Sequence, residues 1–376
     1  GHQDWIQRTT GIPLSPHFGG PKFLFSVRND PDLKGRVESG EALFGPISSF
    51  VTHGLTGSQV IDESIAGRSL LLNLESTAWD PDLLDLFEVP ESCLPRLVPT
   101  CQHVGDVVMG EQSIPVWCVI GDQQASLVGQ ERWGEGDVAM NLGTSGSVLV
   151  NSGRHPTVVP SLLSNVLYSF PRERHFLIEG TINGVGSLFR WLEDYLNLPH
   201  EEMNWEKRCV QATDGILVPG ISGLAAPYWT GEFDTAFMGF AHPEDPDRIV
   251  RAAMESVGFL VKDICEVLGN VTAREPKEIV ASGGFSKPVL LQFIADLLNV
   301  PVWSSKGSDM TALGVARLVA QQTLGIPLNR STGIRDRQIV PTMSSDQRVA
   351  EISRWRGALR VLRIINSRSG GKEANT

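Results

Sequence analysis

The sequence has few cysteines, and their placement excludes several classes of site. Its five cysteines are odd in number and far apart. No two of them have the short spacing of a zinc site or of a redox motif. We therefore expect scattered, mostly buried thiols in a reducing compartment, and hence a cytoplasmic protein. The cysteines are Cys93, Cys101, Cys118, Cys209 and Cys265.

Long apolar runs and clusters of positive charge are also missing. The most apolar window, residues 258–268, is interrupted by Lys262, Asp263 and Glu266, which is typical of a core helix and not of a membrane span. The chain has 32 Lys and Arg against 43 Asp and Glu, a formal net charge of −11, and its basic residues are dispersed. Binding to a nucleic-acid backbone needs concentrated positive charge, so we expect neither nucleic acid nor a membrane as a partner.

What is present indicates a layered α/β protein. With 376 residues and 41% hydrophobic content, the chain is long enough for two domains. Short strand-like runs alternate with amphipathic helical stretches, an order typical of α/β layers. The expected strands are 116–120, 138–141, 147–150, 176–178, 216–219, 279–281 and 300–302. The expected helices are 44–57, one starting at Pro81, 123–130, 183–195, 246–268 and 288–298.

Three glycine-containing turns follow expected strands: Gly121-Asp122, residues 143–146 and residues 282–284. Glycine lets a backbone approach a ligand closely, although each turn taken singly is a weak signal. Asp122, at the end of an apolar strand, has two interpretations. It could cap the following helix, or it could project into a cleft as a general base for a hydroxyl nucleophile in phosphoryl transfer.

A set of motifs, in matching order and spacing, resembles the FGGY carbohydrate kinases, and the glycerol-kinase branch in particular. The resemblance covers about residues 4 to 325. It is carried by Thr10–Pro16, Phe44-Gly45-Pro46, Leu55-Thr56-Gly57, Ala66-Gly67-Arg68, Gly121–Ala125, Gly143-Thr144, Ser222–Trp229, Ala252–Glu255, Gly283-Gly284 and Thr311–Ala316.

The resemblance implies the α/β fold shared by actin, Hsp70 and the sugar kinases, with two ribonuclease-H-like lobes. It implies a partial first lobe over residues 1–105, a complete nucleotide-binding second lobe over 106–325, and a C-terminal extension over 326–376 with a disordered tail. The implied partners are a small polyol or sugar, ATP and Mg²⁺, and homo-oligomers are common in the family.

Site residues follow from the resemblance position by position. Asp122 matches the catalytic base and an indirect Mg²⁺ contact, while Gln123 and His17 match substrate contacts. The residues that match nucleotide contacts are Gly143, Thr144, Gly186, Arg190, Gly284 and Lys287. Arg190 stands where glycerol kinases usually carry Gln, and His17 where they carry Tyr.

The family's opening Asp-x-Gly-Thr turn does not occur in this sequence. We therefore expect an incomplete kinase with little or no activity as this polypeptide alone. The expected reaction of the parent protein is the conversion of glycerol and ATP to glycerol 3-phosphate and ADP. Xylulose, ribulose, gluconate and erythritol remain as alternative substrates. A non-catalytic sugar- or nucleotide-binding module is a second hypothesis, and the motifs disfavour an Hsp70-like ATPase.

Overall fold

The computed structural model describes residues 2–221, 223–231, 233–242, 245–272, 276–306, 309–330 and 332–369. The chain forms two compact units that are interleaved along the sequence. Unit 1 consists of Gly1–Asp137, Leu149–Glu179 and Asp309–Ser331, and unit 2 consists of Val138–Val148, Gly180–Ser308 and Thr332–Thr376. Strands β8 (Gly146–Gly153) and β10 (Glu173–Ile182) each begin in one unit and end in the other.

Unit 1 is rich in short helices. These are α1 (His2–Thr10), α2 (Gly19–Asn29), α3 (Pro31–Glu38), α4 (Ile47–Thr56), α5 (Glu63–Ala66), α6 (Pro81–Leu86), α7 (Asp122–Gly129) and α13 (Met310–Leu324). Its complete strands are β1 (Val60–Asp62), β2 (Leu72–Asn73), β3 (Ala78–Trp79), β4 (Arg96–Val98), β5 (Cys101–Met109), β6 (Gln112–Cys118) and β9 (Leu163–Phe170). Strands β1 and β4 pair in parallel, whereas β5 and β6 form an antiparallel hairpin.

Local signals explain where two of these helices begin and end. Asp80 caps α6, because its carboxylate accepts from the amides of Asp82 and Leu83 at 3.1 Å, and Pro81 occupies the first helical position as predicted. Helix α4 ends at Gly57, which adopts a left-handed φ of 74°. The predicted helix is confirmed, but its apolar face is exposed: Ile47 and Phe50 are 76% and 74% accessible.

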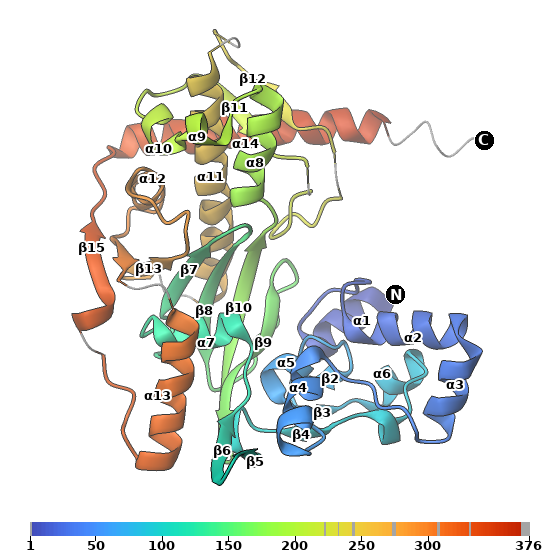
Figure 1. Ribbon diagram of the computed structural model, residues 1–376. Helices are drawn as coiled ribbons and strands as arrows, with labels where there is room; N and C mark the ends of the chain where they lie inside the picture. Colours follow the sequence, from blue (N-terminus) through green and yellow to red (C-terminus); the bar gives the residue numbers. More distant parts are fainter. Residues whose placement is uncertain are drawn as a thin grey trace. The chain divides into compact units, whose positions relative to one another are not determined.

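Helices α7 and α13 lie side by side in unit 1 (Figure 1). Two glycines permit the close approach. A Cβ on Gly129 would lie 1.8 Å from the Met310 carbonyl oxygen, and one on Gly314 would lie 1.8 Å from that of Ala125. Arg317 also donates to the Gly129 carbonyl at 2.9 Å. The helix that begins at Asp122 is therefore fixed along its length by a second helix.

Unit 2 is built on a central sheet. The seven strands of this sheet run in the order β15-β14-β13-β7-β8-β10-β9, and β9 belongs to unit 1. The strands not yet described are β7 (Val138–Leu142), β13 (Ile279–Ser282), β14 (Val302–Ser305) and β15 (Arg335–Ile339). Strand β13 pairs in parallel with both β7 and β14 and is buried along its whole length, as expected for a parallel strand covered on both faces. A separate antiparallel pair joins β11 (Ile216–Val218) and β12 (Ala236–Met238).

The helices of unit 2 are α8 (Gly186–Leu196), α9 (His200–Met203), α10 (Trp205–Arg208), α11 (Pro246–Thr272), α12 (Pro288–Leu298) and α14 (Ser345–Ser369). Asp245 caps α11 as predicted, because its side chain accepts from the Asp247 amide at 3.0 Å. Helix α12 has the predicted bounds, while α8 begins three residues later than expected. No helix in the described part of the chain is both long and apolar enough to cross a bilayer.

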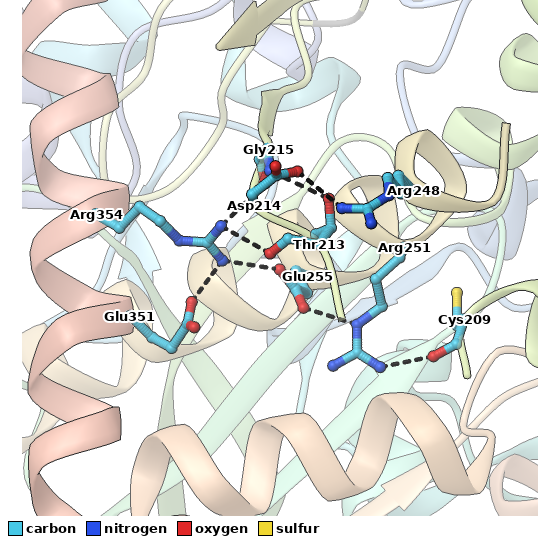
Figure 2. Close-up of polar contacts among 9 residues, drawn as sticks. All are labelled: Cys209, Thr213, Asp214, Gly215, Arg248, Arg251, Glu255, Glu351 and Arg354. Atoms are coloured by element: carbon cyan, nitrogen blue, oxygen red, sulfur yellow. Dashed lines mark hydrogen bonds and ion pairs between the residues drawn. The ribbon is translucent and has the colours of Figure 1, made fainter. Parts of the chain in front are cut away.

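Helix α14 lies in the predicted C-terminal extension and is anchored to the rest of unit 2 by buried polar contacts (Figure 2). Arg354 donates to the Glu255 carboxylate at 3.2 Å and to the carbonyls of Thr213 and Gly215 at 3.1 and 3.2 Å. Trp355 donates to Asp263 at 2.7 Å. The extension therefore carries an ordered helix, and the tail predicted to be disordered, residues 370–376, lies outside the described residues.

Candidate functional site

Asp122 is the first residue of α7, and the chain reaches it directly from β6. Gly121 occupies the N-cap position and has no side chain to cap the helix. The Asp122 carboxylate is exposed, and its Oδ1 accepts from the Gln123 amide at 2.8 Å. The capping interpretation of Asp122 is therefore wrong in its simple form, because another residue takes the cap position. The carboxylate remains accessible to a ligand, and Gln123 beside it is half-buried.

A buried hydrogen-bond network, not predicted from the sequence, holds the backbone just before Asp122 in place. The Gly121 amide donates to Ser64 Oγ at 3.0 Å, and Ser64 Oγ donates to Asp62 Oδ2 at 2.5 Å. Asp62 also accepts from the Ser64 amide at 2.9 Å and from Thr100 Oγ1 at 3.3 Å. Asp62 is fully buried, and desolvation raises its pKa to about 7 against the lowering effect of these hydrogen bonds.

The signal for this network was local and easy to overlook. Asp62 caps the short helix α5, since its side chain accepts from the amides of Ser64 and Ile65. An Asp followed two residues later by Ser, at the end of an apolar strand, is typical of such a cap. The sequence does not show that the Ser64 hydroxyl would then face Gly121, which is 57 residues away in the chain.

His17 lines a cavity of about 260 Å³ in unit 1. The lining is mostly apolar, with Phe44, Trp79 and Leu94 among its members, and it includes the cations Lys22 and Arg68. Arg68 forms an ion pair with the buried carboxylate of Glu179. Neither Asp122 nor Gln123 is among the described residues that line this particular cavity.

Four of the six predicted nucleotide residues line one cavity in unit 2. Its volume is about 610 Å³, and Thr144, Gly186, Arg190 and Lys287 all contribute to its wall. Thr144 and Arg190 are exposed, while Lys287 is half-buried. Arg190 and Lys287 are cations that an anionic ligand could pair with, and the same wall carries the carboxylates of Glu193, Asp194 and Glu206.

Backbone hydrogen bonds join the three segments that form this cavity. The Gly186 amide donates to the Gly143 carbonyl at 3.0 Å, and the Ser187 amide donates to the Thr144 carbonyl at 3.1 Å. The Phe285 amide donates to the Leu142 carbonyl at 2.9 Å, which holds the loop after β13 against the end of β7. The β7–β8 turn therefore touches both the start of α8 and the loop that contains Gly284.

Close contacts explain why positions 186 and 283 carry glycine, whereas position 284 is open. A Cβ on Gly186 would lie 2.6 Å from the Phe285 ring, and Gly283, at φ 97°, leaves only 2.3 Å between such a Cβ and the Leu142 carbonyl. Gly284 has open space around its Cα and is exposed. The amides of Gly186 and Ser187 are used by the turn, so any phosphate contact at this end of α8 must come from other donors.

An aromatic group in the same wall was not predicted. Phe189, Trp205 and Phe285 stack on one another, with ring centroids 4.9 to 5.7 Å apart and interplanar angles of 12° to 28°. Each residue comes from a different segment, so spacing along the sequence does not reveal the group. Flat apolar rings beside cations form a surface suited to a ligand with a planar ring and an anionic tail.

The residues present fit ATP and are compatible with Mg²⁺. The cavity of unit 2 combines aromatic walls with Arg190 and Lys287, which suit a base and phosphates respectively. In the part of the chain that the structure describes, no group of three or more His, Cys, Asp or Glu forms a metal cage. Mg²⁺ in kinases is commonly held by one or two carboxylates together with substrate phosphates, and Asp122 is an accessible carboxylate of unit 1.

Comparisons with known proteins identify the family of the chain. The N-terminal domain model of the FGGY family of carbohydrate kinases matches residues 1–129, and its C-terminal domain model matches residues 138–322. A glycerol kinase of Acinetobacter baylyi is 32% identical over 368 residues, which cover 94% of this chain and 74% of that protein.

Solved structures show the same fold. The structure of Plasmodium falciparum glycerol kinase with ADP superposes with a TM-score of 0.86 at 27% identity, covering 95% of this chain and 74% of that one. Gluconate kinase from Lactobacillus acidophilus gives a TM-score of 0.83 at 24% identity, covering 99% and 77%, and shows the fold alone. The predicted α/β sugar-kinase fold is confirmed, and this chain belongs to the FGGY family of carbohydrate kinases, a family of phosphotransferases.

Proposed function

We propose that the protein transfers the terminal phosphoryl group of ATP to a hydroxyl of a polyol or sugar, with glycerol as the first candidate. Glycerol is favoured because the A. baylyi relative, 32% identical to this chain, is a glycerol kinase. Gluconate is kept as an alternative because a gluconate kinase shares the fold. Xylulose, ribulose and erythritol complete the set of substrates to be tested.

The observation that carries the proposal is the gathering of Thr144, Gly186, Arg190 and Lys287 around one cavity. We assign the nucleotide to this cavity, with its base against the half-buried rings of Trp205 and Phe285, which stack on buried Phe189, and its phosphates toward the two cations. Stacking on an aromatic face tolerates any base, whereas Arg and Lys supply charge-assisted hydrogen bonds to phosphate. We assign Gly143 and Gly284 to the backbone that borders the nucleotide.

Asp122 is the general base in this proposal. Its carboxylate accepts the proton of the attacking hydroxyl, the hydroxyl oxygen forms the new bond to phosphorus, and ADP leaves with the electron pair of the broken bond. A bound Mg²⁺ would supply charge neutralisation at the phosphates. The backbone at Asp122 is positioned from two sides. The preceding Gly121 amide donates to Ser64 Oγ, and Thr311 Oγ1 donates to the Asp122 carbonyl at 3.4 Å. We assign Gln123 and His17 to substrate contacts.

A coupled assay of ADP release tests the proposal on the full-length gene product. The panel contains glycerol, xylulose, ribulose, gluconate and erythritol, each assayed with MgATP. Asp122→Asn should reduce turnover by about 10²- to 10⁴-fold, the usual contribution of a general base. Asp82→Asn is the matched control, because Asp82 is also an exposed carboxylate in the first turn of a helix of unit 1.

The outcomes separate the alternatives. Turnover with one substrate that Asp122→Asn abolishes and Asp82→Asn preserves would establish the kinase and name its substrate. Binding of ATP by calorimetry without turnover on any substrate would instead favour the non-catalytic binding module. Equal turnover in both variants would remove Asp122 from its proposed role.

A further inference from the structure

Two of the five cysteines lie directly opposite each other. In the β5–β6 hairpin, Cys101 is the register partner of Cys118, although 17 positions separate them in the sequence. The expectation that all five thiols are scattered is therefore wrong for this pair. A shift of register between Cys101 and Gly105 sets the pair apart from the regular part of the hairpin, so simple counting from the turn does not predict it.

The pair occupies the kind of position at which side chains approach most closely. The Val119 amide donates to the Thr100 carbonyl at 3.0 Å, which makes 100 and 119 the hydrogen-bonded neighbours and leaves Cys101 and Cys118 as a non-hydrogen-bonded pair. Such pairs have Cα atoms about 4.5 Å apart. Disulfides join Cα atoms separated by about 4.4 to 6.8 Å. This spacing fits the Cα separation that a cross-strand disulfide requires.

The two thiols differ in access. Cys101 is fully buried, whereas Cys118 is half-buried and can meet a reagent from solvent. The remaining cysteines, Cys93, Cys209 and Cys265, are buried and free, and they serve as internal references. An accessible thiol next to an inaccessible one is the arrangement in which the first reacts with an external oxidant and the second resolves the product.

We propose that Cys101 and Cys118 are a redox-convertible thiol pair that closes to a cross-strand disulfide when a small-molecule disulfide is supplied. The Cys118 thiolate attacks one sulfur of glutathione disulfide and releases glutathione thiolate. The Cys101 thiolate then attacks the Cys118 sulfur in the mixed disulfide and releases a second glutathione thiolate. The two thiol protons end on the two glutathione molecules, and the protein has lost two electrons.

The pKa of the Cys118 thiol determines how fast the disulfide forms. The neighbouring Cys101 thiol, burial and the nearby Asp62 all raise the pKa of the Cys118 thiol, so little thiolate is present near neutral pH. Closure is therefore slow at neutral pH and becomes faster as the pH rises. This behaviour differs from that of a low-pKa sensor thiol, which reacts fast throughout this range.

The pair lies where it can act on the approach to Asp122. Strand β6 ends at Cys118, and Asp122 follows four residues later. Thr100, next to Cys101, bonds to Asp62 and to Ser169. A disulfide would fix the first residue of β5 to the last residue of β6. We expect oxidation to lower turnover, and this consequence rests on the proposed function. Formation of the disulfide itself does not depend on any activity.

Peptide mapping of the native protein tests the proposal. The protein is incubated with glutathione disulfide at rising pH, quenched with iodoacetamide under denaturing conditions, digested and analysed by mass spectrometry. We expect a Cys101–Cys118 cross-linked peptide, lighter by two hydrogen atoms than the sum of its parts, that disappears after dithiothreitol. Cys93, Cys209 and Cys265 should be alkylated throughout.

Matched variants and defined contrary outcomes complete the test. Cys118→Ser should give no adduct at Cys101, Cys101→Ala should stop at the mixed disulfide on Cys118, and Cys265→Ser should leave the cross-link unchanged. The wild-type map stands by itself if a variant does not fold. Full alkylation of Cys101 and Cys118 after oxidation, or a lasting glutathione adduct on Cys118 in the wild type, would overturn the proposal, whatever the kinase assay shows.

Discussion

Removing the guanidinium of Arg354 should destabilise unit 2 strongly, because it leaves a buried carboxylate with fewer partners. Glu255 has a side chain only 5% exposed and is held by Arg251 at 2.7 Å and Arg354 at 3.2 Å (Figure 2). Burial raises the pKa of Glu255 despite both arginines, so its charge is already costly. Breaking one side of such a buried pair costs about 3–5 kcal/mol.

Loss of the ion pair alone should cost about 3 kcal/mol, the lower end of that range, and the loss of two further hydrogen bonds adds to this cost. Arg251 stays beside Glu255 in an Arg354→Met variant, so the charge keeps one partner. The carbonyls of Thr213 and Gly215, however, lose their donor, and an unsatisfied buried group costs about 1–3 kcal/mol. We expect a total loss of about 4–6 kcal/mol in the free energy of unfolding, measured by guanidinium denaturation.

Arg356→Met is the matched control on the same helix. Arg356 pairs with Glu266 at 2.7 Å, but the two side chains are 54% and 39% exposed, and exposed pairs contribute about 0–1 kcal/mol. The Arg354→Met loss should also shrink at acidic pH. A carboxyl with a raised pKa contributes most stability below its unfolded value and loses that contribution as the pH rises, and losing Arg354 raises this pKa further. Equal losses in the two variants, or a pH-independent loss in Arg354→Met, would refute the reasoning.

Two further predictions concern the candidate site. The pKa of Asp62 is raised to about 7, so the stability that Asp62 contributes below its ordinary pKa should fall as the pH rises through 7. The free energy of unfolding of the wild type should therefore be lower at pH 8 than at pH 5, and the difference should be smaller in Asp62→Asn. An equal pH dependence in both proteins would contradict this prediction. Gly186→Ala should weaken ATP binding in calorimetry, because its Cβ would lie 2.6 Å from the Phe285 ring, whereas Gly184→Ala, whose Cβ would meet Ser187 Oγ at 3.5 Å, should bind ATP as the wild type does.

Sequence reasoning succeeded where the signal is local. Helix α12 has the predicted bounds, because Pro288 suits the first helical turn and Asn299 adopts the left-handed conformation that ends the helix. Strand β14 begins at Val302 and not at the predicted position 300, since Pro301 has no amide proton for the ladder. Strand β9 was missed, because it is buried along its whole length and carries Ser, Asn and Ser where alternation was sought.

Burial was the least predictable property of the elements. The apolar spacing of α4 correctly gave a helix, yet Ile47 and Phe50 are exposed and Ser49 and Thr52 are buried. Periodicity identifies a face of a helix but not the element that covers it, which depends on contacts distant in sequence. The same limit applies to the cysteines, whose pairing depends on an irregular hairpin, and to the stacked rings of Phe189, Trp205 and Phe285.

The network behind Asp122 shows why matching a motif does not by itself define a site. The motif residues Gly121–Ala125 fix the chemistry available, but Gly121 is positioned by Ser64, and Ser64 is positioned by Asp62. The pKa of Asp62 is raised to about 7, so its charge changes near neutral pH. The placement of Asp122 therefore depends on a buried carboxyl 60 positions upstream, and a variant of Asp62 should affect turnover without contacting any substrate.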